Sequence, residues 1–528
     1  MEFLKKGVII FSSIFIISII VVSSILYVTV FQNRNESVEY PSYSDFYFGA
    51  PYIHTIHPSA LTVNEWLEDL YYLMHIVKEN YPFLWVRERT HDYNWLDLIP
   101  IYREKIINCQ SNNEFLAMIN DLVYALQNVH SFLVRNEYSY SFLSDMYQYV
   151  YPYSYAFNEY TAQAYSYWES FLSSLSYEMY QYFDLQIVYE KGNYSVYGAS
   201  SILETYGIVD GSIIVAVNET PIDEAVKQVF DKDLLKIDYI RNKLYLKYLK
   251  PYHFGTNAIY KIKLNNSTDF IDITLNYGYP PTFLPPDFSK YSSNEYKLLD
   301  SNNAYMYLPT FSHQNKIQDY SDMIAFYEQI EGYDNLIIDI RDNTGGSIYY
   351  WMDNIIKPLQ SSDLNFSFYM AYRNGTYVNS YLNNYYQTSP KISKVELSFL
   401  PAEVYTDAFI DDIHIWEWSL PLPTSNFNFT GNISLIVDDM TYSASEYLIS
   451  FCKQTGFAKI YGTAGGGDGL LRSYLVFALP NSKLLITMAK ECGMTLEGEI
   501  NEEFHTMPDV YYESNFNDWE ELINYIKS

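Results

Sequence analysis

The feature that most constrains this chain is an alternation of apolar and amphipathic segments beyond residue 300. Apolar runs occur in "AYMYLPTF" (304–311), "NLIIDIRDNTGG" (335–346) and "LIVDD" (435–439). Helical patterns such as "YSDMIAFYEQI" separate them. Near-continuous apolar strands separated by helices are typical of a sheet covered on both faces. We therefore predict an α/β fold for residues 285–528, with a Tyr/Asn-rich insertion at about 365–430.

Three regions precede this segment. Residues 60–135 carry apolar side chains at helical spacing and predict a helical N-terminal domain. Residues 136–183 are dense in Tyr and Ser and favour amphipathic helices in an insertion or lid. Residues 184–277 change to short β-branched runs. Near the C-terminus, "SYLVFAL" and "SKLLITMA" predict a hairpin that turns at Pro480 and Asn481.

The first 35 residues form a separate segment. Lys5 and Lys6 precede an uncharged apolar run from Gly7 to Phe31, which is long enough to span a bilayer. Lysines favour the cytoplasmic side, so the rest of the chain is expected outside the cell membrane, held by a single anchor over residues 1–35. The alternative is a cleaved signal peptide, in which case the protein is secreted.

Composition excludes some partners. The formal net charge is −30 and the isoelectric point is about 4.6, which argues against nucleic acid or an anionic membrane surface as a ligand. Cys109, Cys452 and Cys492 have no metal-ligand spacing. Nothing in the sequence implies a metal or an organic cofactor, and it leaves the oligomeric state open.

The segment "LIVDDMTYSASEYLISF" places Ser443 between an apolar strand and an amphipathic helix. A serine hydroxyl at such a corner projects from the carboxyl end of the strand, beside free N–H groups of the first helical turn. Those groups can stabilise an oxyanion. The alternative is that Ser443 or Thr441 only caps the helix. A serine is a weak nucleophile without a base, so the catalytic interpretation requires a partner.

Three motifs together resemble a known family. "SASE", "LIIDIRDNTGG" and "GTAGGGDG" are similar in order and spacing to segments of the C-terminal processing (tail-specific) and tricorn-like serine peptidases. The resemblance implies a crotonase-like (ClpP/crotonase) α/β core with Ser443 as nucleophile and Ser445 as the second choice. It also implies an oxyanion hole formed by the amide of Gly345 or Gly346 with that of Ala444, and a place for Glu446 in the helix behind the nucleophile.

The base distinguishes two branches of this family. The processing branch has a lysine about 25 residues after the serine, where this sequence has Asp468, which cannot act as the base in the same geometry. The nearby Lys459 lies within the predicted strand "AKIYG" and is a weak substitute.

The tricorn-like branch takes a histidine from a motif similar to "L-x-D-G-H-[ST]". The corresponding segment is "LQNVHS" and supplies His130, with Asn128 and Val129 departing from the pattern. The branch also places an acidic residue before a terminal "PD", which implies Glu502 to orient the imidazole, with Glu503 as its alternative.

A second resemblance concerns residues 184–277. "YGIVDGSIIVAVNETPIDEAVKQVF" is similar to a PDZ domain in its order of glycine, turn, apolar strand, turn and helix. Such a domain would bind an extended peptide by adding a strand to its sheet. Any other small β domain is the alternative.

The sequence thus predicts a membrane-anchored, outward-facing serine endopeptidase with a peptide or protein substrate and no metal. Two alternatives remain open. The chain could be a catalytically inactive peptide- or lipid-binding module, because the same fold serves that role in interphotoreceptor retinoid-binding-type repeats. It could also be a Ser/Lys processing protease.

Overall fold

The computed structural model describes residues 57–135, 137–179, 182–255, 257–278, 293–385, 413–424, 429–471, 473–516 and 518–528. All of them belong to the compact unit Phe48–Ser528. The predicted anchor over residues 1–35 lies outside the described residues. Among the helices that are described, none has the length and apolar character required to cross a bilayer.

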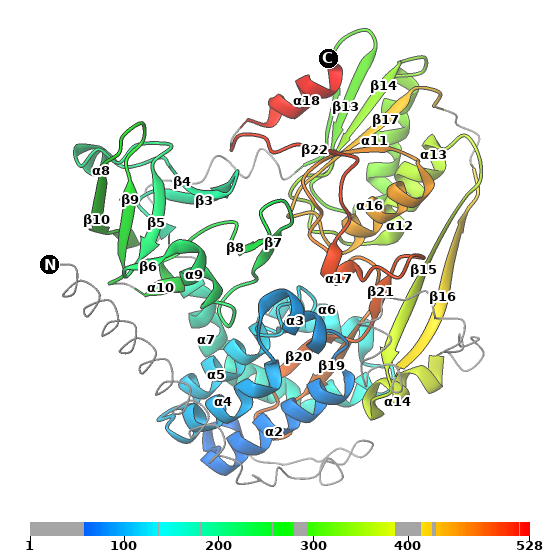
Figure 1. The fold of residues 1–528 in the computed structure, drawn as a ribbon. Coiled ribbons are helices and arrows are strands. Elements are labelled where there is room, and N and C mark those ends of the chain that lie inside the picture. The colour runs from blue at the N-terminus through cyan, green and yellow to red at the C-terminus, as the bar shows by residue number, and fades with distance from the viewer. Residues whose placement is uncertain are drawn as a thin grey trace, which may run out of the picture. The chain divides into compact units, whose positions relative to one another are not determined.

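Helices dominate the first described region (Figure 1). The first and last of them begin at side-chain caps: Thr62 and Glu65 form a reciprocal capping box, and Ser111 accepts from the amide of Glu114. The helical pattern predicted here is confirmed, with buried apolar stripes on the helices α2 (Val63–Asn80), α3 (Leu84–His91), α4 (Leu98–Ile107) and α5 (Asn112–Tyr124).

The Tyr-rich segment forms α6 (Glu137–Tyr147), a short 3-10 helix (Tyr153–Ala156) and α7 (Glu159–Met179). Its aromatic rings pack against the last third of the chain. Tyr153 stacks on Tyr381 with centroids 5.2 Å apart, and the indole N–H of Trp168 donates to the carbonyl of Ser482 at 2.8 Å. The insertion is therefore anchored by aromatic packing to distant segments.

Residues 182–278 form a small β domain with its own apolar core. Its main sheet has the order β10-β9-β5-β4-β3 and every pairing in it is antiparallel. The elements are β2 (Tyr182–Phe183), β3 (Gln186–Glu190), β4 (Asn193–Tyr197), α8 (Ser201–Thr205), β5 (Ile213–Val217), β6 (Thr220–Pro221), α9 (Ile222–Lys227), β7 (Lys236–Asp238), β8 (Lys243–Tyr245), α10 (Pro251–Phe254), β9 (Ile259–Lys263), β10 (Phe270–Thr274) and β11 (Tyr277–Gly278).

The C-terminal region is built on a six-stranded sheet of order β12-β13-β14-β17-β18-β22. All neighbours are parallel except β12, which is antiparallel to β13. The parallel strands place their carboxyl ends along one edge of the sheet. The strands are β12 (Glu295–Leu298), β13 (Asn303–Tyr307), β14 (Asn335–Asp339), β17 (Asn432–Val437), β18 (Lys459–Gly462) and β22 (Val510–Tyr511).

Both faces of this sheet are covered, as predicted. Met306, Ile338 and Leu435 face a core shared with the helices on one side, whereas Tyr305 and Ile337 face a second cluster that includes Leu522 of α18. Figure 1 shows α18 apart from the other helices. The helices are α11 (Lys316–Gln329), α12 (Ile348–Trp351), a π-turn (Met352–Ile356), α13 (Lys357–Leu359), α16 (Ala444–Thr455), α17 (Asn501–Phe504) and α18 (Trp519–Lys527).

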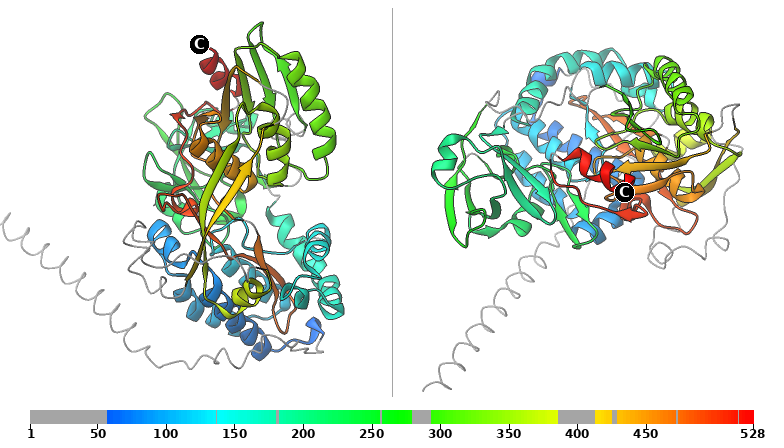
Figure 2. Two further views of the ribbon diagram at one scale, coloured as in Figure 1. Left: turned by 90° about the vertical axis from the view of Figure 1, so that its right-hand side faces the viewer. Right: turned by 90° about the horizontal axis from the view of Figure 1, so that it is seen from above.

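The predicted insertion at 365–430 contains two long strands that pair over their whole length, visible as a ribbon in Figure 2. These are β15 (Leu364–Arg373) and β16 (Ile413–Leu422), with α14 (Thr376–Tyr385) between them in sequence. β15 also pairs with β21 (Cys492–Met494).

The predicted hairpin is confirmed as β19 (Tyr474–Ala478) and β20 (Leu485–Ala489). Its turn is fixed to helix α2, because the buried Asp69 carboxylate accepts from the amides of Asn481 and Ser482, each at 2.8 Å. On its other edge β20 pairs with β1 (Phe132–Leu133). This pairing brings the "LQNVHS" segment from the N-terminal helices to the C-terminal region.

Candidate active site

Ser443 stands between β17 and α16 in a backbone conformation that side chains rarely adopt. Its φ is 60° and its ψ is −128°. For a residue other than glycine this conformation costs on the order of 1–3 kcal/mol, and such strain concentrates at functional sites. The Ser443 side chain makes no capping hydrogen bond with the helix. The hydroxyl is therefore free for another partner.

That partner is His130. Its Nε2 lies 3.1 Å from the Ser443 hydroxyl oxygen, across 313 residues of sequence. Contacts of both the backbone and the ring hold His130 in place. The backbone amide of His130 donates to the Asn128 side chain at 3.1 Å, and the backbone carbonyl accepts from the Thr487 hydroxyl at 2.8 Å. The imidazole ring stacks on Tyr474 with centroids 5.8 Å apart. The structure thus places the predicted nucleophile and the predicted base in hydrogen-bond contact.

The acidic partner differs from the prediction. Asp468 Oδ2, not Glu502, contacts His130 Nδ1 at 2.6 Å. Glu502 lies one step further away: it pairs with the buried guanidinium of Arg87 and accepts from Asn128 at 3.0 Å. Asn128 also donates to Asp468 at 2.8 Å, so its amide joins the two carboxylates.

Asp468 occupies the position of the lysine of the processing branch. A carboxylate cannot replace that lysine as a base, but it can orient a histidine. The sequence offered one signal for this, namely that the acidic residue lost at position 128 is balanced by one gained at position 468. The contact between Asp468 and His130 depends on the tertiary fold, which brings their two segments together.

The electrostatics of the site favour a charged imidazole. Burial by itself would lower the pKa of His130, but the Asp468 carboxylate, helped by Glu502 and Glu491, outweighs burial, and the pKa of His130 is raised above its ordinary value. Burial and the nearby Asp468 charge raise the pKa of Glu502 to about 7, although Arg87 opposes the shift.

The glycine turn of "DNTGG" lies directly against the nucleophile. A Cβ on Gly345 would be 2.8 Å from the Ser443 Cβ and 2.9 Å from the Ala444 amide nitrogen, and one on Gly346 would be 2.3 Å from the Phe311 carbonyl oxygen. Both positions also have positive φ, so only glycine fits. The Gly345 amide already donates to Asn343 at 2.9 Å, which leaves the amides of Gly346 and Ala444 as candidate oxyanion donors.

The three residues that the sequence suggested as alternatives make other contacts. Ser445 is buried and its hydroxyl donates to Asn343 at 2.7 Å, away from His130. Glu503 pairs with Arg89. Lys459 is exposed at the start of β18 and aligns with Ser434 at the early part of β17, whereas Ser443 follows the far end of that strand. Because strands rise about 3.3 Å per residue, Lys459 lies at the wrong edge of the sheet.

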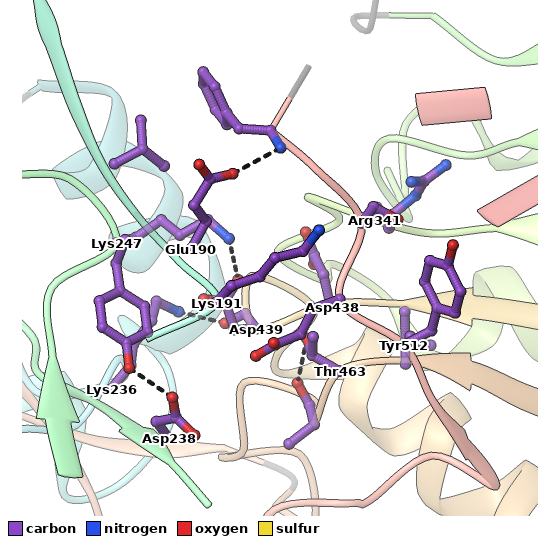
Figure 3. Close-up of a pocket in the computed structure, with 18 of the residues that line it drawn as sticks. Glu190, Lys191, Lys236, Asp238, Lys247, Arg341, Asp438, Asp439, Thr463 and Tyr512 are labelled. Carbon is purple, nitrogen blue, oxygen red and sulfur yellow. Dashed lines mark hydrogen bonds and ion pairs between the residues drawn. The ribbon is translucent and has the colours of Figure 1, made fainter. Parts of the chain in front are cut away.

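A cavity of about 210 Å³ lies between the small β domain and the carboxyl ends of β14, β17 and β18. Figure 3 shows Lys236 and Lys247 beside Asp439, and Lys236 donates to the Asp439 carbonyl. Lys247 pairs with Asp439 at 3.0 Å. The glycines of the segment 462–466 and His505 also line this cavity, whereas Ser443, His130 and Asp468 do not.

Residues 302–511 match Peptidase family S41. The chain therefore carries a peptidase domain of family S41, which contains Ser443, Asp468 and Glu502, while His130 comes from outside the matched segment. No curated protein matches the sequence.

Structures of mature CPAF share the fold. Mature CPAF complexed with lactacystin has a TM-score of 0.54 and 12% sequence identity, over 88% of this chain and 98% of that chain. Another structure of mature CPAF has a TM-score of 0.54 and 11% identity, over 88% and 96%. The photosystem II D1 C-terminal processing protease has a TM-score of 0.36 and 14% identity, over 86% and 94%. At these identities the CPAF likeness concerns the fold.

Proposed function

We propose that this chain is a serine endopeptidase in which Ser443, His130 and Asp468 act together. The observation that carries the proposal is the continuous hydrogen-bonded path from Ser443 Oγ through both ring nitrogens of His130 to Asp468, with Ser443 and Asp468 both in the segment that matches Peptidase family S41. Two regions far apart in sequence, one with His130 and the other with Ser443 and Asp468, meet there in the order that acyl transfer requires.

In the proposed reaction, His130 Nε2 takes the Ser443 proton as Oγ attacks the peptide carbonyl carbon. The amides of Gly346 and Ala444 stabilise the oxyanion. The C–N bond then breaks as the imidazolium gives its proton to the leaving amine, which leaves an acyl-enzyme. A water molecule, deprotonated by His130, hydrolyses this ester and restores Ser443.

Asp468 holds His130 with Nδ1 protonated, so that Nε2 is the acceptor facing Ser443. Its charge also stabilises the imidazolium during the reaction. Asn128 supports this arrangement, because its side-chain amide donates to Asp468 while its carbonyl oxygen accepts from the His130 backbone. Glu502 contributes indirectly by holding Asn128.

The proposal extends to the domains around the site. The parallel sheet with its β17–Ser443–α16 corner supports a crotonase-like core. The antiparallel sheet of the small β domain supports a PDZ-like module, in which an extended peptide adds to an edge strand. Of the described strands, β10 pairs only with β9 and so offers such an edge.

Membrane anchoring with the peptidase outside the cell belongs to the same proposal. It rests on Lys5, Lys6 and the apolar run that follows them. The test is fractionation of expressing cells with external protease treatment. Recovery of the chain in the membrane fraction, digested from outside, is expected; an uncleaved chain in the soluble cell interior would contradict it.

A fluorophosphonate probe tests the catalytic proposal. Stoichiometric labelling of the native chain, lost in Ser443→Ala and His130→Ala, is the expected result, with Lys459→Ala labelling like the native chain. Absence of labelling in folded native protein would contradict the peptidase and favour a non-catalytic peptide- or lipid-binding role. Loss of labelling in Lys459→Ala would favour the Ser/Lys alternative.

A further inference from the structure

Glu446 is a buried carboxyl group that the proposed reaction does not use. It lies in the first turn of α16, three residues after Ser443, and its residue is 0% exposed. A carboxyl group is rarely buried so completely unless it holds other groups in place.

One oxygen of Glu446 holds the segment 501–506. Its Oε1 accepts from the side-chain amide of Asn501 and from the backbone amide of Thr506, each at 2.8 Å. The same two residues hold the glycine-rich loop: Asn501 Oδ1 accepts from the Gly469 amide at 2.8 Å, and the Thr506 carbonyl accepts from the Gly465 amide at 3.1 Å. Both ends of the loop that carries Asp468 are thus tied to residues that Glu446 fixes.

The loop is also shaped to receive this side chain. A Cβ on Gly465 would lie 1.8 Å from Glu446 Oε2, and one on Gly469 would lie 2.6 Å from Glu446 Cβ. Neither glycine has the positive φ that would by itself require glycine. These two glycines of "GTAGGGDG" are therefore needed for close contact with Glu446 rather than for a turn.

We propose that Glu446 is a positioning residue that locks the 465–469 loop and the 501–506 segment onto the nucleophile helix, so that Asp468 stays against His130. This inference rests on the proposed function. It predicts that loss of the Glu446 side chain releases Asp468 while the Ser443 corner remains intact.

The ionisation of Glu446 gives a second way to test its positioning role. No donor to Oε2 is found in the described part of the chain. Burial raises the pKa of Glu446 to about 7, against hydrogen bonds that lower it. Of the titratable side chains, Tyr239 lies near enough for the Glu446 charge to act on it. Because Oε1 only accepts hydrogen bonds, which the carbonyl oxygen of glutamine can also accept, Glu446→Gln should retain the lock and remove one ionisation.

The experiment compares Glu446→Ala and Glu446→Gln with Leu448→Ala, which opens a cavity at another buried position of the same helix. Two readouts are taken: the pH dependence of the fluorophosphonate labelling rate, and amide hydrogen exchange of residues 465–469. Glu446→Ala should label about 10²-fold more slowly, as expected when a catalytic group is misplaced by about 1 Å. Its loop amides should exchange faster, and the ionisation of His130 should move to lower pH as Asp468 withdraws.

Glu446→Gln should label within a few-fold of the native chain, and Leu448→Ala should leave loop exchange and the His130 ionisation unchanged. If Glu446→Ala behaves like Leu448→Ala in both readouts, the inference is wrong. If the native chain fails to label, the proposed function falls, but the exchange comparison still decides whether Glu446 locks the loop.

A second variant, Gly465→Ala, covers the case in which Glu446→Ala folds poorly. Gly465→Ala introduces a Cβ where Glu446 Oε2 lies, so it should disturb the loop as Glu446→Ala does. Because both changes act at one contact, the combined variant should be no worse than either one alone. Fully additive effects would contradict the proposed contact.

Discussion

The two halves of the candidate site are built in different ways. The nucleophile half is local: Ser443 and Ala444 follow β17, and the "DNTGG" turn follows the neighbouring strand β14. The base half is assembled from His130 in the N-terminal helical region, Asp468 in the glycine-rich loop, and Asn128, Arg87 and Glu502 around them. Short motifs describe the first half, whereas the second depends on contacts across more than 300 residues of sequence.

This difference means that the nucleophile half, which short motifs define, tolerates little change. In the base half, by contrast, a carboxylate can be absent from one segment and present in another. Asn128 stands where the related motif has Asp, and Asp468 stands where a related loop has Lys. In the structure the Asn128 amide donates to both Asp468 and Glu502. An aspartate at position 128 would instead place a third carboxylate beside two others, which is unfavourable in a buried site. The altered "LQNVHS" motif is thus consistent with a competent site.

The largest expected effect separates the two serines of the nucleophile half. Ser443→Ala should lower kcat by on the order of 10⁶-fold, as for a serine that acts as a unit with its base. Ser445→Ala removes only a buried hydrogen bond to Asn343 and should cost about 1 kcal/mol of stability with kcat within tenfold. Peptide hydrolysis kinetics measure both, and equal losses would remove the assignment of the nucleophile.

The second prediction compares the two carboxylates of the base half. Asp468→Asn should lower kcat by about 10⁴-fold, because the amide favours the wrong imidazole tautomer. Glu502→Gln, which touches Asn128 rather than His130, should cost far less, on the order of tenfold. The opposite ranking, measured by the same assay, would return the orienting role to Glu502.

The third prediction concerns stability. Arg87→Met leaves Glu502 buried without its ionic partner and should lower the free energy of unfolding by about 3–5 kcal/mol. Arg89→Met breaks a more exposed pair with Glu503 and should cost less than about 1 kcal/mol. Urea denaturation of both variants makes the comparison; similar losses would show that the Arg87 pair does not anchor the base half.

Asn128→Asp tests the exchange of carboxylates directly. The third carboxylate should raise the pKa of its neighbours and slow labelling about tenfold at neutral pH by weakening the contact between Asp468 and His130. The double variant Asn128→Asp/Glu502→Gln removes one negative charge and should recover most of the rate. No recovery would mean that Asn128 matters for its shape alone.

The smallest effect is a shift of the pH profile. His130 must be neutral to accept the Ser443 proton, and its pKa is raised, so labelling should be lost as pH falls through a value above 6.5. In Asp468→Asn the raising charge is gone, and the residual labelling should persist to lower pH. An acid limb that does not move between the two proteins would contradict the ion pair.

The sequence predicted most of the sheet and the nucleophile half because both depend on local patterns. Apolar runs gave β13, β14 and β17, and "SASE" with "DNTGG" identified Ser443 and its glycine turn. His130 was found by position in a motif. Asp468 was missed as the orienting group, since hydrogen-bond partners are set by tertiary packing: β1 pairs with β20, and the loop folds back over α16. The same holds for Arg87 and Asn128, whose partners no short motif names.

The contact between Asp468 and His130 is the central claim, and proton NMR of the imidazole tests it most directly. A low-field signal from the His130 Nδ1 proton should be present in the native chain and in Glu502→Gln, and absent from Asp468→Asn. Loss of the signal in Glu502→Gln, with its survival in Asp468→Asn, would contradict the account.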